Sequence, residues 1–197
     1  GGVFERFDRV RIYIVFRLLF LFYYLPAMGL RDVKKELEQL EQEELIHHIS
    51  ELYKKHKAVK EYFDFFANPD EDELLEQFKE RVYEGFYPKT GKKLKVYKAR
   101  KAINDFKKLA YSAEKVAALL IYFTQVSTVY ARENKLKTEA FYVRIENSFE
   151  AALTHTQQNL ILEQFKEENE SIVERCLPMP WNCHQHMKSI LEQYYDE

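Results

Sequence analysis

The chain has 197 residues, 30 basic and 32 acidic side chains for a formal net charge of −2, and only five glycines and five prolines. So few turn-forming residues exclude a β-sandwich or β-barrel with many tight turns, and the sequence has no glycine-rich phosphate-binding motif of nucleotide enzymes. With 46% hydrophobic and 31% charged residues, the composition is typical of a packed helical domain rather than a disordered chain.

The first 27 residues differ from the rest of the chain. The run over residues 12–25 is strongly apolar but short, and an arginine interrupts it, whereas a membrane-spanning helix needs about 20 apolar residues. We therefore expect no spanning segment. Because a helical pattern begins directly after Met28, we interpret residues 1–27 in two ways: as sequence upstream of a natural start, or as a hydrophobic helix docked on the core or peripheral to a membrane. Residues 28–197 are expected to form a single helical domain.

Apolar residues recur every three or four positions from Leu30 onward, which predicts helices almost throughout. The expected helices cover residues 30–40, 42–56, 59–67, 69–85, 96–109, 112–134, 138 onward, 158–176 and 183–195. The helix over 112–134, with Ser112 as its N-cap, is apolar on nearly all sides, as a helix buried at the centre of a domain is. Since the loops are short, neighbouring helices should be antiparallel. The sequence thus predicts an all-α fold of eight or nine helices packed as antiparallel pairs, in a helical array or irregular bundle.

Residues at the starts of two expected helices predict how those helices begin. Asn68 is the expected cap of the helix that follows it, with Pro69 in the first helical position. Trp181 follows a Pro-Met-Pro sequence and precedes the last helix, and we expect it to fill the core and fix how that helix docks. The aromatic cluster at residues 62–66 is interpreted as core rather than as the lining of a ligand pocket.

The segment 89–108 has the most unusual charge, because its basic residues are opposed by a single acid, Asp105. One interpretation is a solvated basic face balanced by the acidic stretch at residues 70–80. The other is a surface that binds phosphate groups or nucleic acid, with an affinity that falls steeply as salt rises. The candidate binding residues are Lys92, Lys93, Lys95, Lys98, Arg100, Lys101 and Lys108.

Two patterns contain metal-ligand residue types without completing a known motif. Glu44 and His47 have the Glu-x-x-His spacing of di-iron bundles, but the chain has no second copy. Cys176, Cys183 and two nearby histidines lack the close pairs of zinc sites. We expect ordinary side chains at both places, with no metal and no cofactor, and a pair of thiols rather than a disulfide.

Three stretches of the chain resemble a group of small bacterial proteins that carry only a domain-of-unknown-function label. They are LEQLEQEELIHHISELYKK at residues 37–55, FDFFANPDEDELLEQFK at 63–79 and FYPKTGKKLKVYKARKAINDFKKL at 86–109, and residues 181–195 fit less well. The resemblance covers residues 28–197 and implies a start near Met28. It implies no activity, cofactor or functional residue. Where such proteins tend to have a glycine near Trp181, this chain has Pro180 and Asn182.

The sequence has no recognisable catalytic constellation, and no G-x-S-x-G motif. Our first hypothesis is therefore a cytoplasmic, non-enzymatic helical module that binds another macromolecule, a protein in the first instance. The second is a module that binds phosphate or nucleic acid through the basic segment 89–108. The third is an enzyme whose catalytic site is hidden by the order of residues in the sequence.

Overall fold

The computed structural model describes residues 29–91, 93–110 and 112–195. The apolar N-terminal run, the expected start at Met28 and the candidate residue Lys92 lie outside the described residues. Within the described part, all regular structure is helical, so the predicted all-α class is confirmed. None of the described helices is both long enough and apolar enough to cross a membrane.

The helix boundaries agree closely with the apolar periodicity of the sequence. They are α2 (Leu30–Leu37), α3 (Gln42–Lys55), α4 (Lys57–Ala67), α5 (Glu71–Phe86), α6 (Val96–Leu109), α7 (Ala113–Glu133), α8 (Glu139–Gln158), the short 3₁₀ helix η1 (Leu162–Phe165), α9 (Lys166–Arg175) and α10 (Cys183–Tyr195). Contacts divide the described chain into two units, the first ending at Lys60 and the second beginning at Glu61. The expectation of one domain over residues 28–197 stays a prediction.

The described part of the first unit consists of α2, α3 and the start of α4. Neither α2 nor α3 contains a buried residue. The start of α3 is nevertheless capped, because the Glu44 carboxylate accepts a hydrogen bond of 3.0 Å from the backbone N–H of Glu41. This unit therefore has well-formed helices whose apolar side chains remain in contact with solvent.

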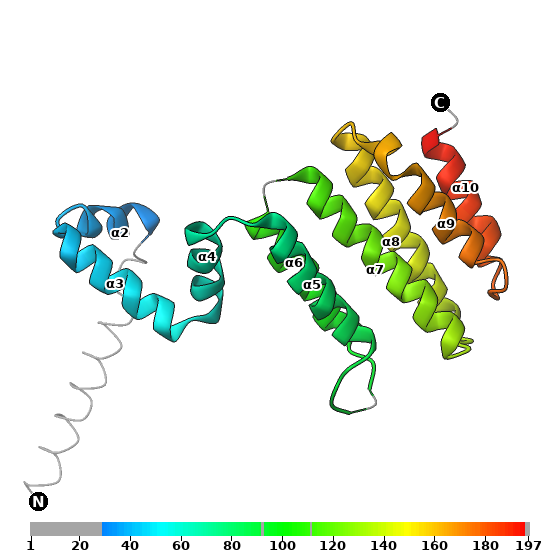
Figure 1. Ribbon diagram of the computed structural model, residues 1–197, viewed down its shortest axis with the longest axis horizontal. Helices are drawn as coiled ribbons and strands as arrows, with labels where there is room; N and C mark the ends of the chain where they lie inside the picture. Colours follow the sequence, from blue (N-terminus) through cyan, green and yellow to red (C-terminus); the bar gives the residue numbers. More distant parts are fainter. Residues whose placement is uncertain (1–28, 92, 111, 196–197) are drawn as a thin grey trace, which may run out of the picture. The chain divides into compact units, whose positions relative to one another are not determined.

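The second unit is an array of antiparallel helix pairs. Figure 1 shows α5 beside α6, α7 beside α8 and α9 beside α10. The pairs contact one another through α5 and α7, through α7 and α9, and through α8 and α10. The central helix is α7, which touches α5, α6, α8 and α9. This arrangement confirms the prediction that helix pairs pack around residues 112–134.

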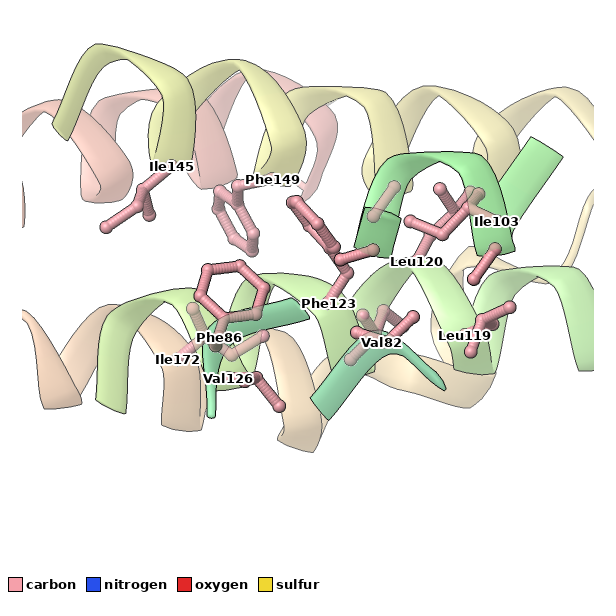
Figure 2. Packing of buried hydrophobic residues seen from close by; sticks show 14 of the residues in the cluster. Val82, Phe86, Ile103, Leu119, Leu120, Phe123, Val126, Ile145, Phe149 and Ile172 are labelled. Atoms are coloured by element: carbon pink, nitrogen blue, oxygen red, sulfur yellow. The ribbon is translucent and has the colours of Figure 1, made fainter. Parts of the chain in front are cut away.

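Aromatic side chains fill the centre of this array. The rings of Phe86 on α5 and Phe123 on α7 have centroids 5.4 Å apart, and Phe149 of α8 is fully buried beside them (Figure 2). Burying each such ring stabilises the fold by about 1.5–3 kcal/mol. The buried hydroxyl groups of Thr124 and Ser127 donate to backbone carbonyls one turn earlier, at 3.2 and 2.7 Å, so these hydroxyls are satisfied within the core.

The start of α5 corrects one boundary expected from the sequence. Its N-cap is Asp70, whose carboxylate accepts hydrogen bonds of 3.0 Å from the backbone N–H groups of Asp72 and Glu73. Asn68, the expected cap, lies two residues too early. Asp70 takes the role because it has the extended backbone of a cap and a carboxylate that reaches both N–H groups.

The start of α7 is tied to the start of α5. Ser112 caps α7 as expected, since its hydroxyl accepts a hydrogen bond of 3.3 Å from the backbone N–H of Lys115. The backbone N–H of Ser112 donates to the Glu71 carboxylate at 3.0 Å, and Lys115 forms an ion pair with Asp72. These links hold the first turns of α5 and α7 at the same end of the array.

The helix expected over residues 158–176 is wrong in its first part, because α8 extends to Gln158 and the chain then turns. Leu160 has a φ of 60°, in the left-handed region, and the backbone N–H of Ile161 donates to the Thr156 carbonyl at 2.9 Å. This is a common way to end a helix. The chain resumes with η1 and α9, and the buried Ile161 anchors the turn.

Of two expectations about aromatic residues, the one for Trp181 is wrong and the one for the cluster at 62–66 holds only in part. Trp181 is 48% exposed, and its indole N–H donates to the Lys137 carbonyl at 2.9 Å instead of entering the core. The backbone at Trp181 and Asn182 is left-handed, with φ of 63° and 51°, and the last helix docks through the buried Cys183 and Met187. In the cluster at 62–66, Phe65 is half-buried and packs against the core as expected, whereas Tyr62 is 50% and Phe66 is 71% exposed.

Candidate functional site

The basic residues expected to bind phosphate lie on the loop before α6 and on α6 itself. Lys93 and Lys98 are exposed, and neither forms an ion pair within the described part of the chain. Lys95 is half-buried at the start of α6, where its backbone N–H donates to the Gly85 carbonyl at 2.8 Å. Arg100 is exposed, and unlike the candidate lysines it lines a hollow beside α8.

Carboxylates neutralise several of the other lysines. Asp105 forms ion pairs with Lys101 and, at 3.4 Å, with Lys108. Partial burial acts to raise the pKa of Asp105, but the two ammonium groups outweigh it and hold that pKa below its usual value. Lys89 lies 2.8 Å from Glu84, and its hydrogen bond is the main reason why the pKa of Glu84 is lowered. The basic segment thus has much of its counter-charge built in.

Arg100 lines a hollow between α6 and α8. The hollow has a volume of about 210 Å³, and its floor is formed by Leu120 and Phe123 of α7. Its walls come from α6 on one side and α8 on the other. The complete lining is Arg100, Ile103, Leu120, Phe123, Asn147, Ser148 and Ala151.

A second, smaller hollow of about 10 Å³ continues the first one along α8. It shares Arg100 and Phe123 with the first and adds Arg144 of α8. Its lining is Phe86, Val96, Arg100, Phe123, Ser127, Phe141, Arg144 and Ile145. We call the two hollows together the α6–α8 groove. No acidic residue lines either of them.

The charges of the α6–α8 groove come from arginines on both walls. Arg100 and Arg144 are exposed, and among the described residues neither has a carboxylate within ion-pair distance. Lys107 lies two turns after Arg100 on the same face of α6, and it is likewise exposed. The groove therefore combines an apolar floor with positive groups that have no internal partner. A guanidinium in this setting can form paired hydrogen bonds with an incoming carboxylate.

Residues of the two patterns with metal-ligand types make contacts of other kinds. In the part of the chain that the structure describes, no three His, Cys, Asp or Glu side chains gather where they could hold a metal ion. Cys176 and Cys183 are buried free thiols, and His186 bonds through Nδ1 to the Glu146 carboxylate at 3.0 Å. Glu44 caps α3, as described above.

A further hollow, of about 240 Å³, lies between the end of α4 and α5. Its charged lining is mostly acidic, with Asp64, Asp70 and Glu73 around it, and Asp70 already serves as the cap of α5. Its one arginine, Arg81, is paired with Glu61 at 2.9 Å. The charges there are largely satisfied, in contrast to those of the α6–α8 groove.

Comparison with known families gives one result. The model of DUF6155, a family of unknown function, matches residues 28–195. The chain belongs to this family. The resemblance drawn from the sequence to a domain of unknown function is confirmed, and the matched region begins at Met28. No curated protein and no solved structure matches the chain.

Sequence reasoning found one wall of the α6–α8 groove and missed the other. Arg100 belongs to the predicted basic set, but Arg144, Asn147, Ser148 and Ala151 of α8 do not. A signal was present, because these four recur every three or four positions beside the buried stripe of α8 and are small or polar except for the arginine. Nothing in the order of the sequence, however, indicates that this face lies opposite α6.

Proposed function

We propose that this DUF6155 protein is a non-catalytic helical module of the bacterial cytoplasm that binds a protein partner, and that the α6–α8 groove receives an acidic segment of that partner. The observation that supports the proposal is the pair of arginines, Arg100 and Arg144, which stand without carboxylates beside an apolar floor. Free thiols at Cys176 and Cys183 fit the reducing conditions of that compartment.

The size of the groove favours a peptide over a small molecule. Pockets for drug-sized ligands measure about 300–1,000 Å³, and the larger hollow has about 210 Å³. Protein interfaces, in contrast, depend on a few apolar anchor side chains in shallow pockets of this kind. Parallel helix walls above the apolar floor of Leu120 and Phe123 suit an amphipathic helix laid lengthwise in the groove.

The charge of the groove sets the chemistry of the segment. Arginines on opposite walls attract carboxylates on both edges of a bound helix, which adds orientation as well as affinity. The partner segment should therefore carry leucine or phenylalanine anchors three or four residues apart, with aspartate or glutamate on either side of them.

The test is selection from a random library of 16-residue peptides against the immobilised full-length protein. We expect enrichment of acidic amphipathic sequences. The best peptide should bind at least tenfold more weakly to the double variant Arg100→Glu/Arg144→Glu, because both walls of the groove then repel the carboxylates of the peptide.

A matched control separates the groove from the neighbouring basic surface. Lys98→Glu/Lys101→Glu makes the same change in net charge outside the groove lining, and it should leave peptide binding within about threefold. A library that yields no acidic helix pattern, or a peptide that responds equally to both double variants, would contradict the proposal.

Binding of phosphate or nucleic acid remains a second candidate function. Lys93 and Lys98 support it because both are exposed and form no ion pair within the described residues, and Lys98 is near enough to Glu84 to contribute to the lowered pKa of that carboxylate. The ion pairs of Lys101 and Lys108 with Asp105 reduce the charge available to such a ligand.

A further inference from the structure

Three loops of the second unit lie at one end of the helix array. Because the helices from α5 to α10 alternate in direction, the α5–α6, α7–α8 and α9–α10 loops share that end, as Figure 1 shows. Hydrogen bonds connect them, since the Tyr87 hydroxyl donates to the Glu133 carboxylate and the Trp181 indole N–H donates to the Lys137 carbonyl. We call this end the hairpin end, and its described loop residues are 87–91, 93–95, 134–138 and 176–182.

The charge of these loops has one sign. The described loop residues of the hairpin end include lysines but no aspartate or glutamate. Lys93, Lys135 and Lys137 are exposed, and none of them forms an ion pair within the described part of the chain. Lys95 is half-buried, and Lys89 is paired with Glu84 at 2.8 Å. At least three ammonium groups are therefore free to meet an anionic partner.

Acidic residues at the hairpin end occur in the adjoining turns of the helices. Two of the four already have partners, because Glu84 pairs with Lys89 and Glu133 accepts the Tyr87 hydroxyl. The other two are exposed, and basic residues in the same helix ends match them in number. The acids are Glu84, Glu133, Glu139 and Glu174, and the basic residues of these turns are Lys98, Arg132 and Arg175.

The opposite end of the array is acidic. The helices α5, α7 and α9 all begin there, and each has acidic residues in its first turn. The array thus has a positive end and a negative end, and such a charge distribution orients a protein toward an anionic surface. The acidic first-turn residues are Glu71, Asp72, Glu73, Glu114, Glu167 and Glu168.

The hairpin end also exposes apolar and aromatic side chains. Leu177 is 59% exposed. Trp181 has a left-handed backbone that bulky residues seldom adopt, and its hydrogen bond of 2.9 Å to the Lys137 carbonyl holds the half-exposed indole beside that lysine. Tyr97, in the first turn of α6, is exposed as well. Tryptophan and tyrosine beside lysines are typical of surfaces that lie at the headgroup level of a membrane.

We propose that the hairpin end binds the surface of an anionic lipid bilayer, with Trp181 and Leu177 entering the headgroup layer and the loop lysines contacting lipid phosphates. Charge alone would suit a nucleic acid equally well. Leu177 favours lipid, because an exposed leucine gains from contact with acyl chains but has no ring on which a base can stack. This peripheral contact needs no spanning helix, and it is independent of the α6–α8 groove.

The fluorescence of Trp181 provides a direct test, because the chain has a single tryptophan. The full chain is mixed at 50 mM salt with vesicles of phosphatidylcholine that contain about 30% phosphatidylserine. We expect the emission to move to shorter wavelength and to be quenched by brominated acyl chains, since the indole enters less polar surroundings. Vesicles of phosphatidylcholine alone should bind at least tenfold more weakly, because the lysines then meet no net negative charge.

Two loop variants and a matched control locate the contact. In co-sedimentation with the anionic vesicles, Lys135→Ala/Lys137→Ala should weaken binding at least tenfold, because each lysine near such a surface contributes a factor of about five. Leu177→Ala should weaken it about three- to tenfold through lost apolar contact. Lys107→Ala/Lys108→Ala makes the same change in charge at the far end of α6 and should change binding by less than about threefold. All five side chains are exposed, so the fold should persist, as circular dichroism can verify.

The proposal is overturned if the full chain does not bind the anionic vesicles. Binding that leaves the emission of Trp181 unchanged would place the contact elsewhere, for example in the apolar segment at residues 12–25. Equal losses for the loop variant and the control would show attraction without a defined surface. An equal shift of the emission with a 20-nucleotide single strand in place of vesicles would assign the hairpin end to nucleic acid instead of lipid.

Discussion

Among the described glycines, Gly85 has the least room for a side chain. It lies in the last turn of α5, and a Cβ there would be 2.7 Å from the Cβ of Ala99 and 2.9 Å from its backbone nitrogen. We expect Gly85→Ala to lower the free energy of unfolding by about 1–3 kcal/mol, because overpacking outweighs the roughly 1 kcal/mol gained in helix propensity. Urea denaturation followed by circular dichroism measures the change.

A second substitution tests the cause of that loss. Ala99→Gly in the Gly85→Ala background removes the closest contact but leaves the contact with the backbone nitrogen, so we expect partial recovery. If Gly85→Ala unfolds at the same urea concentration as the wild type, α5 and α6 separate at this point without cost, and the close approach is not a constraint on the sequence.

The fold limits the reactivity of the two cysteines. Cys176 and Cys183 are both 0% exposed, and a hydrogen bond with Cys176, together with burial, raises the pKa of Cys183. Cys183 is thus kept as a thiol, which is a poor nucleophile, and Cys176 is shielded from reagents by its burial. In native buffer at pH 8 we expect alkylation by iodoacetamide to be at least about 100-fold slower than in urea, because it requires local opening. Mass spectrometry would contradict this if either thiol were modified at the rate of a free peptide.

At the scale of the element, the start of α5 offers a direct comparison of two capping residues. The Asp70 carboxylate accepts hydrogen bonds from two backbone N–H groups. Asn68 accepts one through its backbone carbonyl, from the N–H of Asp70 at 2.9 Å, but none through its side chain in the described structure. Asp70→Ala should therefore lower the free energy of unfolding by about 1 kcal/mol, whereas Asn68→Ala should change it by less than about 0.5 kcal/mol. Equal effects in thermal or urea denaturation would show that the cap is shared between them.

This boundary also shows how far sequence patterns determine the elements. The recurrence of apolar residues every three or four positions locates α5, α6, α7 and α10 within a few residues, because burial of one face is what stabilises these helices. Ends depend instead on single hydrogen bonds, and Asn68 and Asp70 are equally good caps by residue type. The turn at Leu160 and the outward Trp181 both use left-handed backbone at residues other than glycine, which no periodicity indicates.

The candidate site was less accessible to the same reasoning. The basic segment was visible because like charges are adjacent in sequence, and it led to Arg100. The opposing wall was not visible. Arg100 and Arg144 line the same hollow only because α6 and α8, which are separate in sequence, both lie beside α7. Which lysines keep their charge free is also a tertiary property, since Glu80 and Glu84 reach Lys89 from a different element.

On the scale of the whole molecule, the net charge is −2, but the positive groups on and near α6 form two separate sets. Arg100 and Arg144 lie beside an apolar floor and suit a carboxylate-bearing protein. The lysines on the outer side of α6 are exposed, and Asp105 partly neutralises them. Only the second set offers the purely electrostatic contact that a polyanion needs, so the two candidate functions depend on different residues.

Asp105 allows this division to be tested in one substitution. Asp105→Asn removes the counter-charge of Lys101 and Lys108, and it leaves the lining of the α6–α8 groove unchanged. We expect its affinity for a 20-nucleotide single strand, measured by fluorescence anisotropy at 50 mM salt, to exceed that of the wild type by about two- to fivefold. The gain should vanish near 200 mM salt, because released counterions supply it. Adding Lys98→Glu/Lys101→Glu to the wild type or to the Asp105→Asn variant should abolish binding of the single strand. If the affinity changes neither with salt nor with this charge reversal, nucleic acid is excluded as a ligand of this surface.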